Sequence, residues 1–282
     1  MASPFEAMMN RVFTKRLIME NTWLIEGVGC YSYLLIGNES AILIDSGMSR
    51  RNLKEYCEEI TKLPIKGVIN THGHFDHTGG NGWFDKAFMH PLAVSMAKKP
   101  FEGMKSGLNF DNNEVTGGYS FDFDIEKLED GQVIELGGRP LEIIYIGAHS
   151  PGSIAILDKK YRLLFTGDEL ESGQVLLFLN EEGHPVTQTV ENHQKMMKKL
   201  KSRMAEFDFI CPSHNGSMMH NSYVDIFIQA EQEILGGAVG IEDISSPTLP
   251  VGEGGIFQNN EFFRRYESGG ANICYDTRRV KG

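Results

Sequence analysis

Four side chains that can bind a metal or move a proton lie close together in the segment VINTHGHFDHTGGN. They are His72, His74, Asp76 and His77. Side chains two positions apart point to the same side of an extended segment, so the first three can face one site. Imidazole nitrogens and a carboxylate together form a ligand set that suits zinc, iron or manganese. The segment therefore predicts a metal site in preference to a solvated, histidine-rich loop.

Three later segments each present one more candidate ligand. They are GAHSPGS with His149, FTGDE with Asp168 and CPSHNG with His214. Any one of these residues alone could be an ordinary surface or structural residue. Each follows a strand-like run, or nearly so, and ligands tend to bind at the carboxyl ends of strands in a sheet. The combination favours one site shared with the earlier histidine cluster.

The elements that must position these side chains can be read from the hydrophobic pattern. The apolar run at 65–70 is predicted to be a buried strand that ends just before His72. The run at 40–47 is another strand and ends near Asp45, and a helix at about 50–63 separates the two, which makes a βα unit. Further strands are predicted at 132–136, 141–146, 153–158, 162–168 and 207–214, and further helices at about 187–204 and 221–235.

The composition restricts the class of protein and of partner. The chain has 282 residues, of which 41% are hydrophobic and 23% charged, as in a soluble globular protein with a sizeable core. The net charge of -11 disfavours nucleic acid as a partner, because phosphate backbones are repelled. A small anionic substrate stays possible, since a bound metal inverts the local field. Nothing in the sequence sets an oligomeric state.

The cysteines and the absence of apolar runs bear on location. The four cysteines are far apart and form no CxxC pair, so we expect free thiols in a reducing compartment. We see no signal-peptide pattern at the start and no run of 18 apolar residues, so no membrane span is expected. These observations predict a cytoplasmic protein.

The combined pattern resembles the metallo-β-lactamase fold superfamily. The chain carries HxHxDH at 72–77, then His149, Asp168 and His214 in the same order as that family, over roughly residues 20–235. The resemblance implies an α+β fold, a four-layer αββα sandwich of two mixed β-sheets flanked by helices. We expect residues 1–235 to form the catalytic domain, with an insertion or lid at about 101–124. Residues 236–282 are expected to be an irregular C-terminal extension packed on the same domain.

The resemblance also assigns roles to the candidate residues. It implies that Asp168 bridges two divalent ions, most simply zinc, with iron or manganese as alternatives. Asp45 would lie behind the site and accept an N–H from a ligand histidine, although a capping role at the end of its strand is the competing interpretation. The other ligands implied are His72, His74 and His149 for the first ion, and Asp76, His77 and His214 for the second.

The implied reaction is hydrolysis of a small-molecule ester, thioester or lactone by a hydroxide that bridges the two metals. Asp76 lies beside that hydroxide and is the candidate proton shuttle. A carboxylate at Asp168 is typical of thioesterases, lactonases and phosphodiesterases of this superfamily, and it makes a true β-lactamase less favoured. The alternatives are an iron-dependent enzyme similar to persulfide dioxygenases, a phosphodiesterase, and a scaffold that uses its metals structurally. His193 is expected to be solvated. His220 follows His214 by six residues and could approach the site, but it is not expected to be a ligand.

Overall fold

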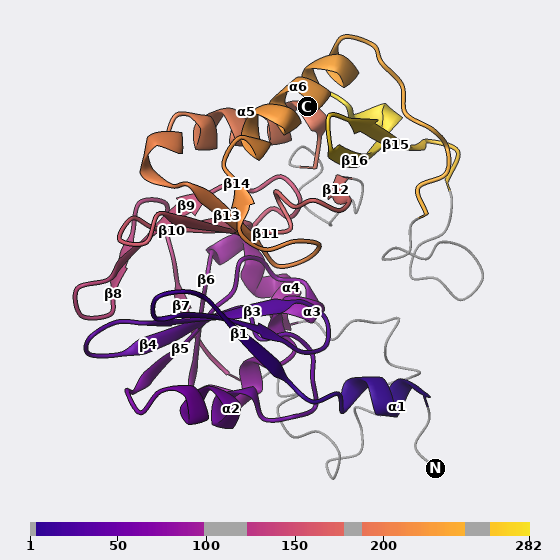
Figure 1. The fold of residues 1–282 in the computed structure, drawn as a ribbon. Coiled ribbons are helices and arrows are strands. Elements are labelled where there is room, and N and C mark those ends of the chain that lie inside the picture. The colour runs from indigo at the N-terminus through magenta and orange to yellow at the C-terminus, as the bar shows by residue number, and fades with distance from the viewer. Residues whose placement is uncertain (1–3, 99–122, 178–187, 246–259) are drawn as a thin grey trace.

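Two β-sheets lie face to face between layers of helices in the computed structural model of the protein, which describes residues 4–98, 123–177, 188–245 and 260–282 (Figure 1). Helix α2 (Leu53–Ile60) covers the outer face of one sheet. Helices α5 (Val190–Lys201) and α6 (Tyr223–Leu235) cover the outer face of the other. The predicted four-layer αββα sandwich with two mixed sheets is confirmed.

The first sheet has seven strands in the order β1-β2-β3-β4-β5-β6-β7. Neighbours from β1 to β4 run antiparallel, and neighbours from β4 to β7 run parallel. The parallel half brings the carboxyl ends of β4 and β5 to the same edge, beside the histidine cluster. The strands are β1 (Thr14–Met19), β2 (Thr22–Glu26), β3 (Tyr31–Ile36), β4 (Ala41–Ile44), β5 (Ile65–Ile69), β6 (Lys86–Met89) and β7 (Asp124–Lys127).

The second sheet has six strands in the order β14-β13-β11-β10-β9-β8. Strands β11 and β13 run parallel, and the other pairs run antiparallel. Every residue of β10 and β11 is buried, because one sheet packs on one face of these strands and helices pack on the other. The strands are β8 (Val133–Glu135), β9 (Pro140–Tyr145), β10 (Ile154–Asp158), β11 (Leu163–Gly167), β13 (Phe209–Pro212) and β14 (Met219–His220).

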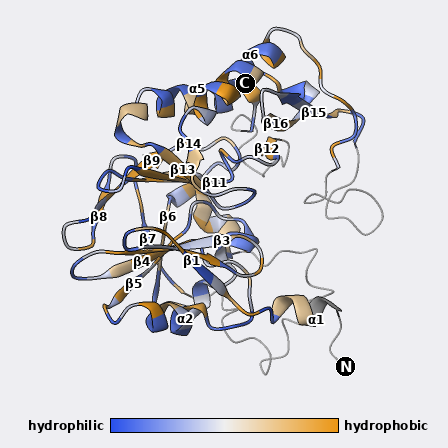
Figure 2. Ribbon diagram, in the orientation of Figure 1, coloured by the Kyte–Doolittle hydropathy of each residue, from blue (hydrophilic) through white to orange (hydrophobic). Residues whose placement is uncertain are grey.

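Three hydrophobic clusters fill the spaces between the four layers. The central cluster joins the sheets and includes Tyr33 and Phe165, whose rings lie 5.0 Å apart. The second packs α5 and α6 on the second sheet, and the third packs α2 on the first sheet through Leu53 and Cys57. Figure 2 shows the consequence, with hydrophobic residues along β9 and both hydrophilic and hydrophobic residues on α2 and α5.

Short helices complete the described part of the chain. Helix α3 begins directly after His74 and carries Asp76 and His77. Of the insertion predicted at 101–124, only the last two residues are among those described, so the predicted lid lies outside them. The short helices are α1 (Pro4–Met9), η1 (Asn81–Trp83), η2 (Pro91–Ala93), α3 (Phe75–Thr78), α4 (Val94–Lys98), η4 (Met204–Glu206) and η5 (Thr277–Arg279).

The prediction of an irregular extension at 236–282 is wrong for its last part. Strands β15 (Phe263–Ser268) and β16 (Ala271–Asp276) form an antiparallel hairpin. Its turn is Gly269 and Gly270, which both have positive φ as a tight hairpin turn requires. Strand β16 also pairs in parallel with β12 (Val175–Leu177) and so makes a third, three-stranded sheet. The two glycines between β-rich runs were a turn signal in the sequence.

A buried arginine connects the two main sheets. Arg139 is fully buried, and its Nε donates to Asp158 Oδ2 at 2.8 Å. Its Nη1 donates to the carbonyl oxygens of Asn21 and Ile36, at 2.6 and 3.0 Å. Its Nη2 donates to the Thr22 hydroxyl at 2.6 Å. The guanidinium of the second sheet therefore satisfies backbone and side-chain acceptors of the first sheet.

We predict that Arg139→Met destabilises the protein by about 3–5 kcal/mol, because it leaves the buried Asp158 carboxylate without its charged partner. Urea unfolding of the wild type and the variant measures this change. The double variant Arg139→Met/Asp158→Asn is the control, and it should recover part of the loss. Equal stability of the wild type and Arg139→Met would contradict the role assigned to this ion pair.

Candidate metal centre

The seven residues predicted as ligands meet at one edge of the sandwich. Strand β5 ends at Ile69, and His72 and His74 follow it before α3 begins. His149 follows β9, Asp168 directly follows β11, and His214 lies two residues after β13. Segments up to 142 positions apart in sequence (214−72=142) are thus brought to a single point. The fold accounts for this convergence, because each segment leaves a strand at the same edge.

Three imidazoles form the first group of ligand atoms. His72 Nε2 lies 2.8 Å from His74 Nδ1, and His149 Nε2 lies 3.1 Å from the same His74 nitrogen. All three candidate ligand atoms lie within 4.8 Å of one another. Nitrogen lone pairs at such distances repel unless a cation or a proton lies between them. The geometry fits one metal ion bound by three histidines.

A carboxylate and two imidazoles form the second group. His214 Nε2 lies 3.2 Å from Asp76 Oδ2 and 3.2 Å from His77 Nε2. His77 Nε2 and Asp76 Oδ2 are 3.5 Å apart. This mixed nitrogen and oxygen set also fits one divalent ion.

The carboxylate of Asp168 lies between the two groups. Its Oδ2 is 3.6 Å from His149 Nε2 and 4.0 Å from His72 Nε2. Its Oδ1 is 3.2 Å from His77 Nε2 and 3.6 Å from His214 Nε2. One oxygen therefore faces each group, which is the arrangement that a bridging carboxylate needs.

The electrostatics of this cluster favour a cation. Asp168 Oδ1 is buried and finds no hydrogen-bond donor among the described residues. Burial opposes the ionisation of Asp168, but the imidazoles of His77 and His214 outweigh it and hold the pKa of this carboxyl well below its usual range. Burial would likewise lower the pKa of His214, yet Asp168 and Asp76 raise it to about 9. The field that attracts this proton also attracts a divalent ion, so the residues present fit a metal.

Asp45 fixes the orientation of one candidate ligand from behind. It is fully buried, and its Oδ2 lies 2.9 Å from His77 Nδ1. The same oxygen accepts hydrogen bonds from the hydroxyls of Thr71 and Ser213, each at 2.8 Å. Since a carboxylate only accepts, His77 carries its proton on Nδ1 and presents Nε2 to the site. Asp45 thereby ties together the segments that follow β4, β5 and β13.

His149 is held by the third sheet and by a buried glutamate. Its Nδ1 lies 3.0 Å from the carbonyl oxygen of Leu176, on β12. Its backbone N–H donates to Glu169 Oε1 at 2.7 Å, and Gln188 Nε2 donates to its carbonyl oxygen at 2.7 Å. The C-terminal hairpin therefore supports the site indirectly, since β12 is paired with β16.

The expectation that His193 is solvated is wrong. His193 is fully buried between α5 and α6, with its Nδ1 against Glu231 Oε1 and its Nε2 2.7 Å from the carbonyl oxygen of Glu169. A carbonyl and a carboxylate only accept, so both ring nitrogens carry protons. Burial would lower the pKa of His193, but Glu231 outweighs it and raises this pKa to about 9. His193 contacts Glu169, which is 24 positions away in the sequence, and Glu231, which is 38 positions away. Contacts at such separations leave no local pattern in the sequence.

Two more buried groups beside the site were not predicted. Glu171 is buried, and burial together with Asp168 raises its pKa to about 8. Cys30 lies behind the site with Asp45 and His77, and burial raises the pKa of its thiol to about 12. Burial thus favours the neutral form of both groups. All four cysteines are free and buried, as expected of free thiols.

A further histidine considered in the sequence lies away from the site. His220 is exposed on β14 and pairs with the Ser222 hydroxyl, so it is not part of the cluster. His184 lies outside the described residues.

Comparison with known proteins places the chain in a family. A model described as the Metallo-beta-lactamase superfamily matches residues 25–226, a range that contains all seven candidate ligands and Asp45. The chain belongs to the metallo-β-lactamase superfamily. The resemblance inferred from the sequence motifs is therefore confirmed.

Curated relatives of this superfamily chain include thioesterases. Human Acyl-coenzyme A thioesterase MBLAC2 is 31% identical over 176 residues, which cover 52% of this chain and 60% of the relative. Hydroxyacylglutathione hydrolase GloC of Haemophilus influenzae is 28% identical over 145 residues, which cover 49% of this chain and 64% of the relative. The chain spans less than two thirds of the length of both.

Solved structures of the superfamily share the fold. A metallo-beta-lactamase from Pontibacter korlensis superposes with a TM-score of 0.58 at 17% identity, covering 78% of this chain and 99% of that one. The sec-alkyl sulfatase PisA1, as a double mutant, superposes with a TM-score of 0.60 at 17% identity, covering 81% of this chain and 43% of that one. Identities this low show the fold and leave the substrate open.

We predict that Glu231→Gln changes how stability depends on pH. A histidine whose pKa rises from 6.5 to about 9 on folding stabilises the protein fully below pH 6.5, and this stabilisation disappears as pH rises through 9. The loss amounts to roughly 3 kcal/mol at most for His193. Without Glu231, the pKa of His193 falls, so the variant loses less stability than the wild type when pH rises from 6.5 to 9.5.

Urea unfolding at pH 6.5 and pH 9.5 measures the effect. The difference in free energy of unfolding between wild type and Glu231→Gln should narrow at the higher pH. Gln229→Ala, on the exposed side of α6, is the control and should leave the pH dependence unchanged. Parallel pH curves for wild type and Glu231→Gln would contradict the buried ion pair.

Proposed function

We propose that the protein is a dinuclear metal-dependent hydrolase of small-molecule thioesters. The observation that carries the proposal is the position of Asp168, with one oxygen toward His72 and His149 and the other toward His77 and His214. A carboxylate placed in this way would serve as a common ligand to two ions. The superfamily and the thioesterases among its relatives support this reaction class.

The donor set supports zinc as the metal. Five of the seven proposed ligands are imidazoles and two are carboxylates, a combination that suits zinc and that iron or manganese can also occupy. Two such ions would supply a water deprotonated near neutral pH and would polarise the carbonyl of the substrate. The role of this chain's own residues is to hold that site rigid and to move protons.

Asp76 is the proposed proton shuttle. Its Oδ2 faces His77 and His214, and its other oxygen, Oδ1, would take the proton that the attacking water gives up. The proton then passes to the sulfur of the leaving thiol, so that the products are a carboxylic acid and a thiol. Burial opposes ionisation of Asp76, but His77 and His214 hold its pKa well below the usual range and keep the carboxylate ionised.

Thioesters are favoured over the esters and lactones that the sequence also allowed. The names of two relatives state thioester substrates, an acyl-coenzyme A and a hydroxyacylglutathione. An "Atrochrysone carboxyl ACP thioesterase" of Aspergillus fumigatus is 23% identical over 211 residues, which cover 73% of this chain and 56% of that relative. A thioester has an activated carbonyl and a good leaving group, which suits a site without a separate nucleophilic side chain.

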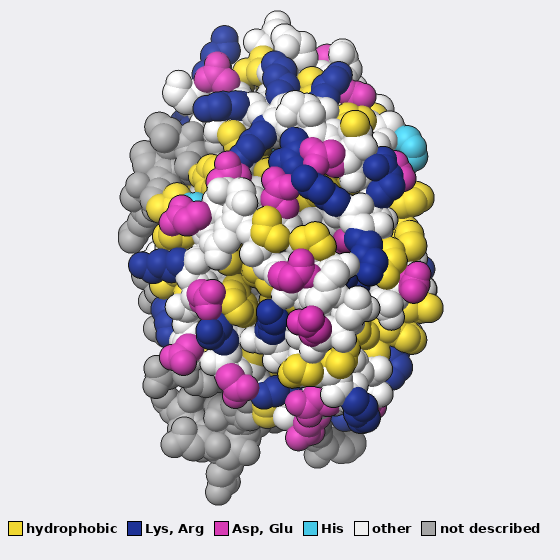
Figure 3. Space-filling model, turned by 90° about the vertical axis from the view of Figure 1, so that its left-hand side faces the viewer, with side chains coloured by type: hydrophobic (Ala, Val, Ile, Leu, Met, Phe, Trp, Pro, Cys, Tyr) yellow, Lys and Arg dark blue, Asp and Glu magenta, His cyan; other side chains and the backbone are white. Residues whose placement is uncertain are grey.

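We propose the location and the partners that the sequence indicated, a cytoplasmic protein that does not bind nucleic acid. No described helix combines the length and the hydropathy that a membrane span needs. Four buried, unpaired cysteines support the proposal of a reducing compartment such as the cytoplasm. Basic and acidic side chains are interspersed over the face drawn in Figure 3, which supports the proposal that nucleic acid is not a partner.

We expect turnover of S-lactoylglutathione or an acyl-coenzyme A at a higher kcat/KM than bis-nitrophenyl phosphate, a cephalosporin or an acyl-homoserine lactone. Dialysis against a chelator should abolish this activity, and added zinc should restore it. The measurement is a rate panel at matched metal content.

Two results would overturn the proposal. Preferred turnover of the phosphodiester would assign the phosphodiesterase alternative. Iron as the sole stoichiometric metal, with oxygen consumed in the presence of a glutathione persulfide, would assign the persulfide dioxygenase alternative.

A further inference from the structure

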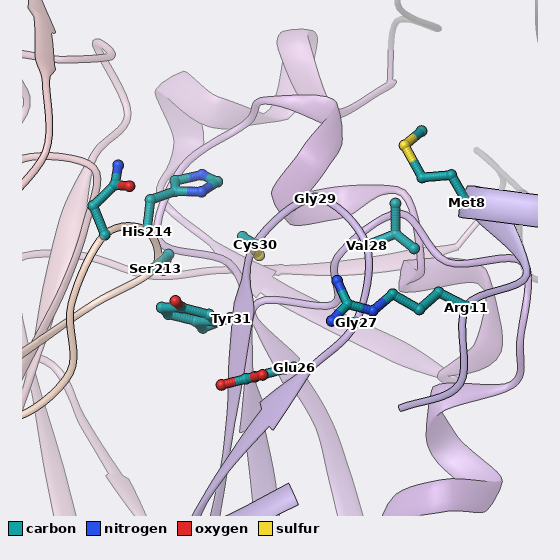
Figure 4. Close-up of a pocket in the computed structure, with 11 residues that line it drawn as sticks. Met8, Arg11, Glu26, Gly27, Val28, Gly29, Cys30, Tyr31, Ser213 and His214 are labelled. Atoms are coloured by element: carbon teal, nitrogen blue, oxygen red, sulfur yellow. The ribbon is translucent and has the colours of Figure 1, made fainter. Parts of the chain in front are cut away.

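A pocket of about 420 Å³ opens beside the candidate metal centre (Figure 4). One wall is His214 with its neighbours in the segment after β13, and the opposite wall is Met8 and Arg11 near the end of α1. The loop 27–29 between β2 and β3 forms the surface between these walls. Figure 4 shows His214 and Arg11 approaching from opposite sides of this loop.

The floor of the pocket is in direct contact with the site. Gly29 has a φ of +94°, and a Cβ at this position would lie 2.7 Å from the carbonyl oxygen of Asp76. His214, which lines the pocket, lies 3.2 Å from Asp76 Oδ2. The pocket therefore opens from the second group of candidate ligands and not from the group that contains His149.

Arg11 supplies a positive charge without a partner. Its side chain is exposed, and among the described residues its guanidinium makes neither a hydrogen bond nor an ion pair. Glu26, which also lines the pocket, accepts a weak hydrogen bond from the Thr14 hydroxyl at 3.4 Å and forms no ion pair with Arg11. The guanidinium is therefore available to a ligand, and its planar donors suit a carboxylate or a phosphate.

We infer that this pocket binds the thiol half of the substrate and that Arg11 pairs with an anionic group on it, a carboxylate or a phosphate. The inference rests on the proposed thioesterase function. Polar surface exceeds apolar surface in the pocket lining, although Met8 and Val28 also contribute to it, and this balance suits a polar thiol better than an aliphatic acyl chain. A net charge of -11 repels such an anion, so a local cation is needed to hold it.

The experiment compares three thioesters that share one acyl group. S-acylglutathione carries carboxylates, acyl-coenzyme A carries phosphates, and S-acyl-N-acetylcysteamine is neutral. We expect Arg11→Gln to raise KM for an anionic thioester about ten-fold, the typical worth of a charged hydrogen bond, with kcat nearly unchanged. KM for the neutral thioester should not change, and Arg11→Lys should restore part of the affinity.

Lys127→Gln is the matched control, since it removes one exposed positive charge from β7, at the other edge of the first sheet. It should leave all three KM values unchanged. Added salt should raise KM for the anionic substrates more in the wild type than in Arg11→Gln. Thermal unfolding of Arg11→Gln should match the wild type, because the side chain is exposed.

The outcomes separate this inference from the proposed function. A KM effect confined to the glutathione or to the coenzyme A substrate supports the inference and identifies the anion as carboxylate or phosphate. Turnover of all three thioesters with equal KM in wild type and Arg11→Gln overturns the inference and leaves the thioesterase standing. No turnover of any thioester by the metal-loaded wild type overturns both.

Discussion

A single, largely buried carboxylate, Asp168, is the constraint on which the rest of the site depends. Its two oxygens face two different groups of ligand atoms, and four imidazole nitrogens lie within 4.0 Å of it. Burial alone would force this carboxyl to take up a proton, and only the surrounding positive charge keeps it ionised. Strand β11 must therefore bring Asp168 to a point that three other segments also reach, because a buried carboxylate oxygen without partners would destabilise the fold.

The sandwich meets this requirement by building the site at the edge where strands of both sheets end. Asp45 at the end of β4 joins His77 of one sheet to Ser213 of the other through hydrogen bonds of 2.8 to 2.9 Å. On the opposite side, β12 and Glu169 hold His149, and Glu169 is in turn held against α5 through its carbonyl oxygen. Asp45 thus orients a histidine of one ligand group, and Glu169 and β12 orient a histidine of the other. Hydrogen bonds from residues behind the ligands are how a rigid fold orients metal ligands.

Much of the site followed from the sequence because its signals are local. The spacing of His72, His74 and Asp76 is visible within five residues, whereas Asp168 and His214 became candidates only in combination with that cluster, and their roles came from the resemblance to a family. Glu169, His193 and Glu231 escaped prediction, since their contacts join α5, α6 and the end of β11 and leave no periodic pattern. The hairpin of β15 and β16 was missed although its Gly269–Gly270 turn could be read locally. Long-range packing of polar groups is the part that a single sequence does not reveal.

The most direct test is the number of metal ions that the chain binds. Protein stripped of metal and titrated with zinc by calorimetry should bind two equivalents per chain, and Asp168→Asn should weaken both equivalents. Asp208→Asn, at an exposed carboxylate paired with Arg162, is the matched control and should bind as the wild type does. Binding of only one ion by the wild type, or unchanged binding of two ions by Asp168→Asn, would contradict a site built around a shared carboxylate.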